Sequence, residues 1–150
     1  MMNNNSLVQQ LFLGVLFFSG TAIVLADTCQ PTSQMGRGTH YKPITEQKLD
    51  IGTGFKVRGR ILSAENCQPI ANARVEHWQA GENGRYQDRL RAYRLSGPDG
   101  RYDFETEWPA AAVPHIHFIV KAEGYKPLQT QWVGDERTPS IQFDMVLEKD

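Results

Sequence analysis

The chain has 150 residues, of which 40% are hydrophobic and 22% charged, and its formal net charge is −1. This length is sufficient for one domain with a sizeable core. The balanced charge argues against a nucleic-acid-binding protein, because such proteins carry a basic excess or a basic stripe.

Residues 1–26 differ from the rest of the chain. They carry no charged side chain, include an apolar run over 11–18, and end in Val24-Leu25-Ala26. We interpret them as a signal peptide cleaved after Ala26, which predicts a secreted or periplasmic protein without a stable membrane span after cleavage. The alternative is an uncleaved membrane anchor, since the apolar stretch nearly reaches spanning length.

Both cysteines, Cys29 and Cys67, follow the predicted cleavage site. An even number of cysteines in an exported chain predicts one disulfide, with two free thiols as the alternative. Two cysteines cannot build a sulfur-rich metal site, so a metal ion here would need His, Tyr or carboxylate ligands.

Residues 27–54 are rich in Gly, Pro and polar side chains, which predicts an irregular N-terminal arm rather than a second domain. Residues 55–150 contain short strand-like runs separated by turns and no sustained helical period, so we predict an all-β single sandwich domain. Within it, Glu76 is expected to face solvent and Trp78 to lie in the core. The turn Gly97-Pro98-Asp99-Gly100 predicts a hairpin between its flanking strands. The predicted strands cover 57–62, 71–78, 93–96, 101–106, 115–121, 128–133 and 140–147.

His115 and His117 are the most informative pair in the sequence. They begin a predicted strand, and strand residues two apart share a face, so both imidazoles point the same way. Neutral imidazole is the commonest protein metal ligand and suits iron, copper and zinc. The pair therefore indicates a metal site; the alternative is two surface or pocket histidines without a metal.

Three specific blocks occur in order along the chain: Trp78-Gln79-Ala80, Gly84-Arg85-Tyr86 and Pro114-His115-Ile116-His117-Phe118. In this order they resemble the intradiol ring-cleavage dioxygenases of the protocatechuate and catechol type. The arm segment Pro31-Thr32-Ser33-Gln34 is similar to the start of protocatechuate enzymes. The less specific blocks at 58–62, 68–73, 97–102 and 124–127 also resemble transthyretin-like and carboxypeptidase-regulatory sandwich modules.

The resemblance implies a transthyretin-like, intradiol dioxygenase-type β-sandwich holding non-haem Fe(III). By position, Tyr86, His115 and His117 match three of the family's metal ligands, and Gln131 matches its active-site glutamine. The implied activity is an oxidoreductase of aromatic compound catabolism, which cleaves a small aromatic diol with O2 between its hydroxyl carbons to give a muconate-type diacid.

The chain also departs from the family. The axial tyrosine that precedes the histidines has no counterpart in 107–113, and the family's arginine falls on Ala112. Either another residue completes the site or three protein ligands leave positions open for water and substrate. The candidates for a fourth ligand are His40, Tyr41, His77 and Tyr93.

Two rival functions follow from these departures. One is a non-catalytic metal- or ligand-binding module on the same sandwich. The other is a related metalloenzyme with altered chemistry, since three such ligands also suit copper or ferrous iron.

Overall fold

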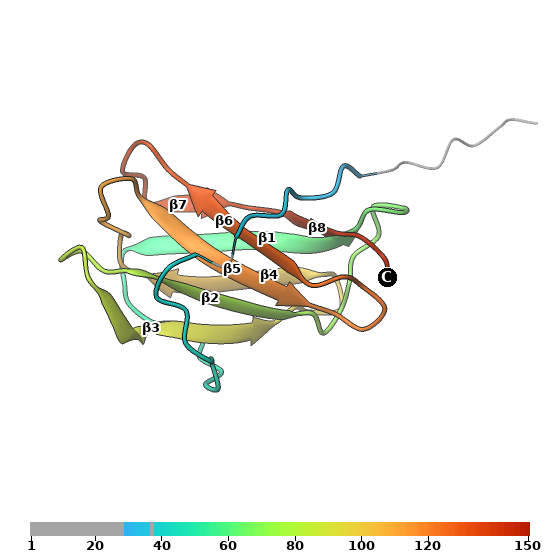
Figure 1. The fold of residues 1–150 in the computed structure, drawn as a ribbon, viewed down its shortest axis with the longest axis horizontal. Coiled ribbons are helices and arrows are strands. Elements are labelled where there is room, and N and C mark those ends of the chain that lie inside the picture. The colour runs from blue at the N-terminus through green and yellow to red at the C-terminus, as the bar shows by residue number, and fades with distance from the viewer. Residues whose placement is uncertain (1–28, 37) are drawn as a thin grey trace, which may run out of the picture.

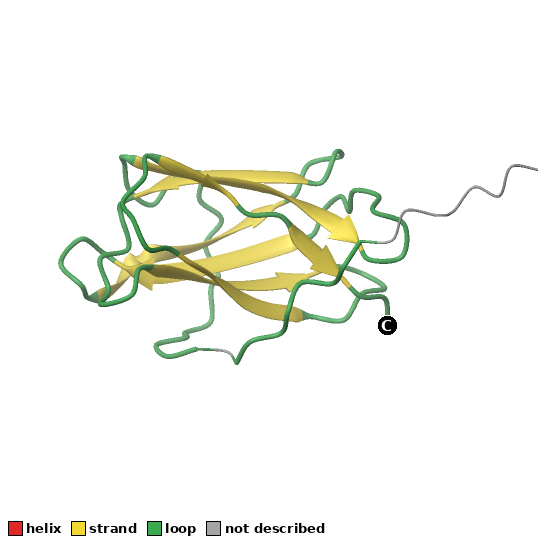
Figure 2. Ribbon diagram, turned by 90° about the horizontal axis from the view of Figure 1, so that it is seen from above, coloured by secondary structure: helices red, strands yellow, loops and turns green. Residues whose placement is uncertain are grey.

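The structure, a computed structural model, describes residues 29–36 and 38–150, so the predicted signal peptide at 1–26 lies outside the described residues. Every regular element in the described part is a strand, and Figure 2 shows the strands stacked in two layers. The predicted all-β sandwich is confirmed. Within the same residues, no helix is long and apolar enough to cross a membrane. The strands are β1 (Phe55–Ser63), β2 (Arg74–Ala80), β3 (Tyr86–Leu95), β4 (Arg101–Thr106), β5 (His115–Lys121), β6 (Leu128–Val133), β7 (Ser140–Gln142) and β8 (Met145–Leu147).

The strands form two sheets that enclose the main core. One sheet has the order β4-β1-β7, with β8 also paired to β1, and the other has the order β3-β2-β5-β6. Side chains alternate between faces along each strand, so half of them enter the layer between the sheets. That layer is the main core, and it includes Val57, Tyr102, Phe104, Ile116, Phe118, Val120 and Met145.

The predicted hairpin around Gly97–Gly100 is wrong. β3 pairs with β2 in one sheet, whereas β4 pairs with β1 in the other, so this turn carries the chain across the sandwich. Gly100 has a φ of 73°, and a Cβ there would collide with the Ile61 carbonyl oxygen of β1. A tight turn has the same local sequence in a hairpin and in a crossing, so only packing against β1 distinguishes them.

The predicted strand at 140–147 is broken into β7 and β8, which both pair parallel to β1. The break occurs because polar groups of other strands bind the residues between them. The Tyr102 hydroxyl donates to the Phe143 carbonyl oxygen at 2.6 Å, and the backbone N–H of Arg60 donates to Asp144 Oδ1 at 2.9 Å. These bonds bend the chain out of the ladder for two residues.

The N-terminal arm crosses the outer face of the β3-β2-β5-β6 sheet (Figure 1). The predicted disulfide, Cys29–Cys67, is present and fixes the start of the arm. A disulfide is consistent with an extracytoplasmic location. Further along, Ile44 of the arm packs on Trp78 of β2 and Ile119 of β5, forming a second small core outside the sandwich.

The expectation that Glu76 faces solvent is wrong, because the arm covers it. Glu76 is 3% exposed, its Oε1 lies 2.9 Å from Arg74 Nε, and its Oε2 accepts a hydrogen bond from the Tyr41 hydroxyl at 3.2 Å. Buried carboxylates need such partners. The arm thus converts an outward-facing strand position into a buried ion pair.

We expect His77 to make the fold sensitive to acid. It is buried against Phe104, with ring centroids 3.7 Å apart, and neither ring nitrogen has a partner. Burial, helped by the charge of Arg94, lowers its pKa to about 3. The unfolded chain therefore binds a proton at His77 more readily than the folded chain does. The contribution of His77 to the free energy of unfolding is complete above about pH 6.5 and is lost as the pH falls towards 3, by up to about 1.4 kcal/mol per pH unit. In urea unfolding at pH 7, 5 and 4, His77→Phe should flatten this dependence relative to the wild type; equal slopes in the two proteins would contradict this expectation.

Candidate metal centre

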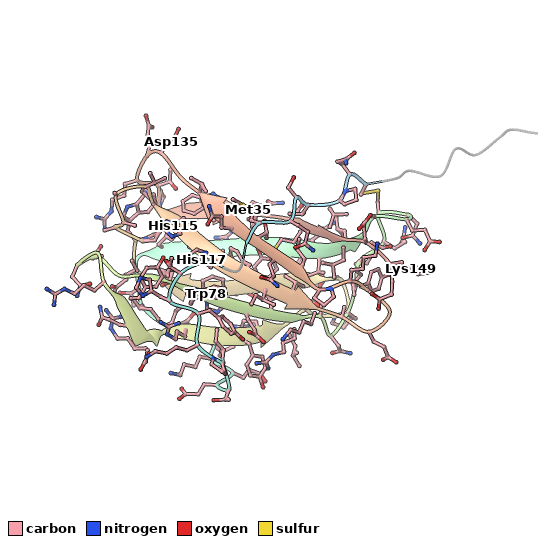
Figure 3. The ribbon with its side chains drawn as sticks, in the orientation of Figure 1. Met35, Trp78, His115, His117, Asp135 and Lys149 are labelled. Carbon is pink, nitrogen blue, oxygen red and sulfur yellow. A yellow bond between two sulfur atoms is a disulfide. The ribbon has the colours of Figure 1, made fainter. Side chains whose placement is uncertain are left out.

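The predicted site residues lie on the outer face of the β3-β2-β5-β6 sheet. His117 on β5 is directly opposite Trp78 on β2 and Gln131 on β6. The β2–β3 register is interrupted between Trp78 and Ala80, where β3 contains extra residues, and Tyr86, the first residue of β3, pairs with Ala80 beside the same end of the sheet. Figure 3 labels His115, His117 and Trp78, which follow one another across β5 and β2.

Three donor atoms from Tyr86, His115 and His117 meet at this end of the sheet. The Tyr86 hydroxyl oxygen is 2.8 Å from His115 Nε2 and 3.0 Å from His117 Nε2, and the two Nε2 atoms are 3.1 Å apart. We call these three side chains the Tyr86 triad. Tyr86 thus forms a triangle of one oxygen and two nitrogens with two histidines that lie 29 and 31 positions further along the chain.

The histidines of the triad have lone pairs available at neutral pH. His115 Nδ1 lies 2.7 Å from the Val113 carbonyl oxygen, which can only accept, so Nδ1 carries the hydrogen and Nε2 keeps its lone pair in the neutral ring. Burial, followed by the charges of His115 and His40, lowers the pKa of His117 to about 4. A ring N–H that donates to a backbone carbonyl oxygen, as in His115, is typical of metal-binding imidazoles.

Tyr86 has the opposite tendency. Its partial burial raises the pKa of its hydroxyl, while the Thr39 side chain and the charge of Arg91 act in the other direction. In the protein alone, Tyr86 is therefore a neutral phenol at pH 7. A cation between the three donors is the influence that would ionise it.

The arm holds the triad from outside. His117 stacks on Trp78, with centroids 4.9 Å apart, and Gly38 lies so close to its imidazole that a Cβ would overlap the ring. The Thr39 carbonyl oxygen accepts from Trp78 Nε1 at 3.2 Å, and the His40 carbonyl oxygen accepts from an Arg91 guanidinium nitrogen at 2.7 Å. Sequence reasoning missed these contacts; the one available signal was a glycine close to a histidine in an irregular segment.

The four candidate fourth ligands lie in different places. His77 is inside the sandwich, on the far side of the sheet. Tyr93 lies under the Arg74 guanidinium at 3.5 Å, and Tyr41 packs edge-on against Trp78. Only the ring of His40 contacts the triad, stacked on Tyr86 with centroids 4.4 Å apart.

The described residues contain no group of three or more His, Cys, Asp or Glu side chains that could hold a metal ion together. A metal ion at His115 and His117 would therefore take the Tyr86 oxygen as its third donor. A hollow of about 810 Å³ exists on the other sheet, where charged side chains such as Lys56, Arg58 and Asp103 line it. No member of the triad contributes to that hollow.

No protein-family profile matches the chain. It is 31% identical over 126 residues to hydroxyquinol 1,2-dioxygenase of Rhizobium sp. (strain MTP-10005), covering 64% of the chain and 42% of the relative. It is 32% identical over 111 residues to catechol 1,2-dioxygenase 2 of Acinetobacter lwoffii, covering 55% of the chain and 40% of that relative.

The dioxygenase domain of a carbohydrate-binding fusion protein from Streptomyces sp. SirexAA-E has the same fold, with a TM-score of 0.71 at 22% identity over 81% of the chain and 100% of that domain. The chain is thus a distant relative of the intradiol ring-cleavage dioxygenases in sequence and shares the fold of their domains.

Intradiol dioxygenases typically bind non-haem Fe(III), and their substrates are catechols and O2. The donor set of the triad fits this ion, because a phenolate is a hard anionic ligand and neutral imidazole also suits iron. The chain spans only 37–42% of the length of the relatives it matches.

Replacing Gly38 tests how closely the arm holds His117. Gly38 has a φ of 75° and no room for a Cβ, whereas Gly36 has no atom within 4 Å of the corresponding position. Gly38→Ala should lower the free energy of unfolding of the metal-free protein by about 1–2 kcal/mol and shift the NMR signals of the His117 ring. Gly36→Ala should change neither, and equal behaviour of the two variants would show that the arm does not pack on His117 in solution.

Proposed function

We propose that this protein is an exported non-haem iron dioxygenase that binds Fe(III) through Tyr86, His115 and His117. Its proposed reaction is intradiol cleavage of a catechol-type aromatic with O2. The observation that carries the proposal is the triangle of one phenol oxygen and two imidazole nitrogens, with edges of 2.8–3.1 Å. Similarity to hydroxyquinol and catechol 1,2-dioxygenases supports a small aromatic diol as the substrate.

The triad residues have separate parts in the proposed site. Tyr86 supplies negative charge, and the two neutral imidazoles add nitrogen donors without further charge. The Val113 carbonyl oxygen orients His115, and Trp78 stacks on His117, so neither ring turns freely. Ferric iron, when bound, would withdraw electron density from a chelated catecholate and so prepare the ring for O2.

Gln131 is the proposed substrate contact. It lies opposite His117 in the β5–β6 ladder, half-buried, and its side chain forms no hydrogen bond with another described residue. An amide group there has its N–H donors available for a substrate oxygen on which charge develops.

The rival functions predict different colours and products. A zinc-bound or metal-free binding module is colourless, and a copper or ferrous enzyme lacks the ferric tyrosinate spectrum. Tyrosinate bound to Fe(III) gives a red-brown protein, and catechol cleavage adds the absorbance of a muconate-type product. Metal content and visible spectra with and without catechol under air therefore separate the proposed enzyme from its rivals.

Loss of a triad side chain should remove the metal. The mature wild-type protein is expected to hold one iron with a tyrosinate band that shifts on addition of catechol. Tyr86→Phe and His115→Ala should lose most of this iron, because two protein donors hold a metal ion weakly. Tyr93→Phe should retain it, since Tyr93 packs under Arg74 away from the triad. Full iron retention in Tyr86→Phe, measured by metal analysis, would refute the assignment.

Loss of Gln131 should reduce turnover without removing iron. Gln131→Ala is expected to lower kcat about a hundredfold, the usual cost of removing one preorganised donor to a developing charge. Gln129→Ala is the matched control, because Gln129 lies two residues along β6 and opposite Ile119. If both variants lose the same activity at equal iron content, Gln131 has no specific part in the reaction.

A further inference from the structure

We propose that His40, on the N-terminal arm, is the fourth protein ligand of the metal ion. The proposal rests on the proposed function, since it assumes that the Tyr86 triad binds iron. It assigns the irregular arm a direct part in the metal site rather than only a covering role.

The other histidines and tyrosines of the chain are engaged away from the triad. The chain has four histidines and five tyrosines, and all of them lie within the described residues. Apart from the triad and His40, each is held elsewhere. His77 is in the sandwich core, Tyr41 is bonded to Glu76, Tyr93 lies under Arg74, Tyr102 donates to Phe143, and Tyr125 pairs with Lys149 at another end of the sandwich.

The nearby acidic side chains and the cysteines are also engaged. Asp88 accepts from Lys42 at 2.7 Å, and Glu107 accepts two hydrogen bonds from Arg89. Both cysteines form the disulfide. These carboxylates already have cationic partners, so binding a metal would require breaking existing pairs.

The His40 ring lies against the triad. It stacks on Tyr86 with centroids 4.4 Å apart and planes 20° from parallel. The His40 imidazole is therefore in direct contact with a member of the triad. His40 is the one remaining imidazole that touches a triad member, and its ring nitrogens have no hydrogen-bond partner in the described part of the chain.

The backbone at His40 is held by hydrogen bonds, whereas the His40 side chain is exposed. His40 has a φ of 61°, which is unusual for a residue other than glycine. Its carbonyl oxygen is held by Arg91, a residue 8% exposed, and the preceding carbonyl by Trp78. The side chain itself is exposed, so rotation from the stacked position towards the three donors costs little.

The test compares the mature wild-type protein with His40→Ala and Tyr41→Phe, each loaded with Fe(III). Iron affinity is measured by competition with a chelator, and the site is followed by the tyrosinate band and by ferric electron paramagnetic resonance. His40→Ala should lose at least about tenfold in affinity and change both spectra, and added imidazole should restore them. Tyr41→Phe changes the neighbouring arm residue and should match the wild type.

The outcomes separate the two proposals. A wild-type protein without iron or a tyrosinate band overturns both. Iron in the wild type with unchanged affinity and spectra in His40→Ala overturns only the fourth ligand and leaves three protein ligands with open positions. A loss in His40→Ala that imidazole does not restore also overturns it, because the effect would then come from a displaced arm.

Discussion

The packing of the N-terminal arm against the β3-β2-β5-β6 sheet is the constraint on which the site depends. Trp78 and Ile119 point away from the main core, and the arm buries them with Ile44. The disulfide at Cys29 fixes one end of the arm, and the backbone bond from Met35 to Gln129 fixes it over β6. The central strands β2 and β5 are consequently buried on both faces, which is unusual for an antiparallel sheet at the surface.

Burial on both faces gives the candidate centre its precision. His115 and His117 project from a strand with partners on both sides, so their backbone cannot shift without breaking two ladders. Tyr86 approaches from the next strand but one, at the end of β3 where the β2–β3 register is interrupted, and its hydroxyl reaches both histidines. Histidines that stand on a central strand can be held at fixed distances although the chain spans only part of its relatives' length.

The electrostatic environment of the triad favours binding of a cation. The buried environment favours a neutral His117 and a neutral Tyr86, so these two donors carry no charge of their own before a cation binds. Arg91, whose positive charge acts on Tyr86, is turned to the arm carbonyl of His40 and to Asp88. Binding a metal and ionising Tyr86 would then occur together, which couples the metal affinity to pH.

The sequence by itself determined the sandwich, most of the strands, the disulfide and the shared face of His115 and His117, because these follow from a period of two and from cysteine count. The resemblance to a family added Tyr86, whose own surroundings carry no local sign of a ligand. Only the tertiary structure decided that β3 and β4 belong to different sheets, that Glu76 is buried, and that Gly38 and His40 lie against the triad. The reason is that these features depend on contacts between segments far apart in the chain, which local periodicity does not encode.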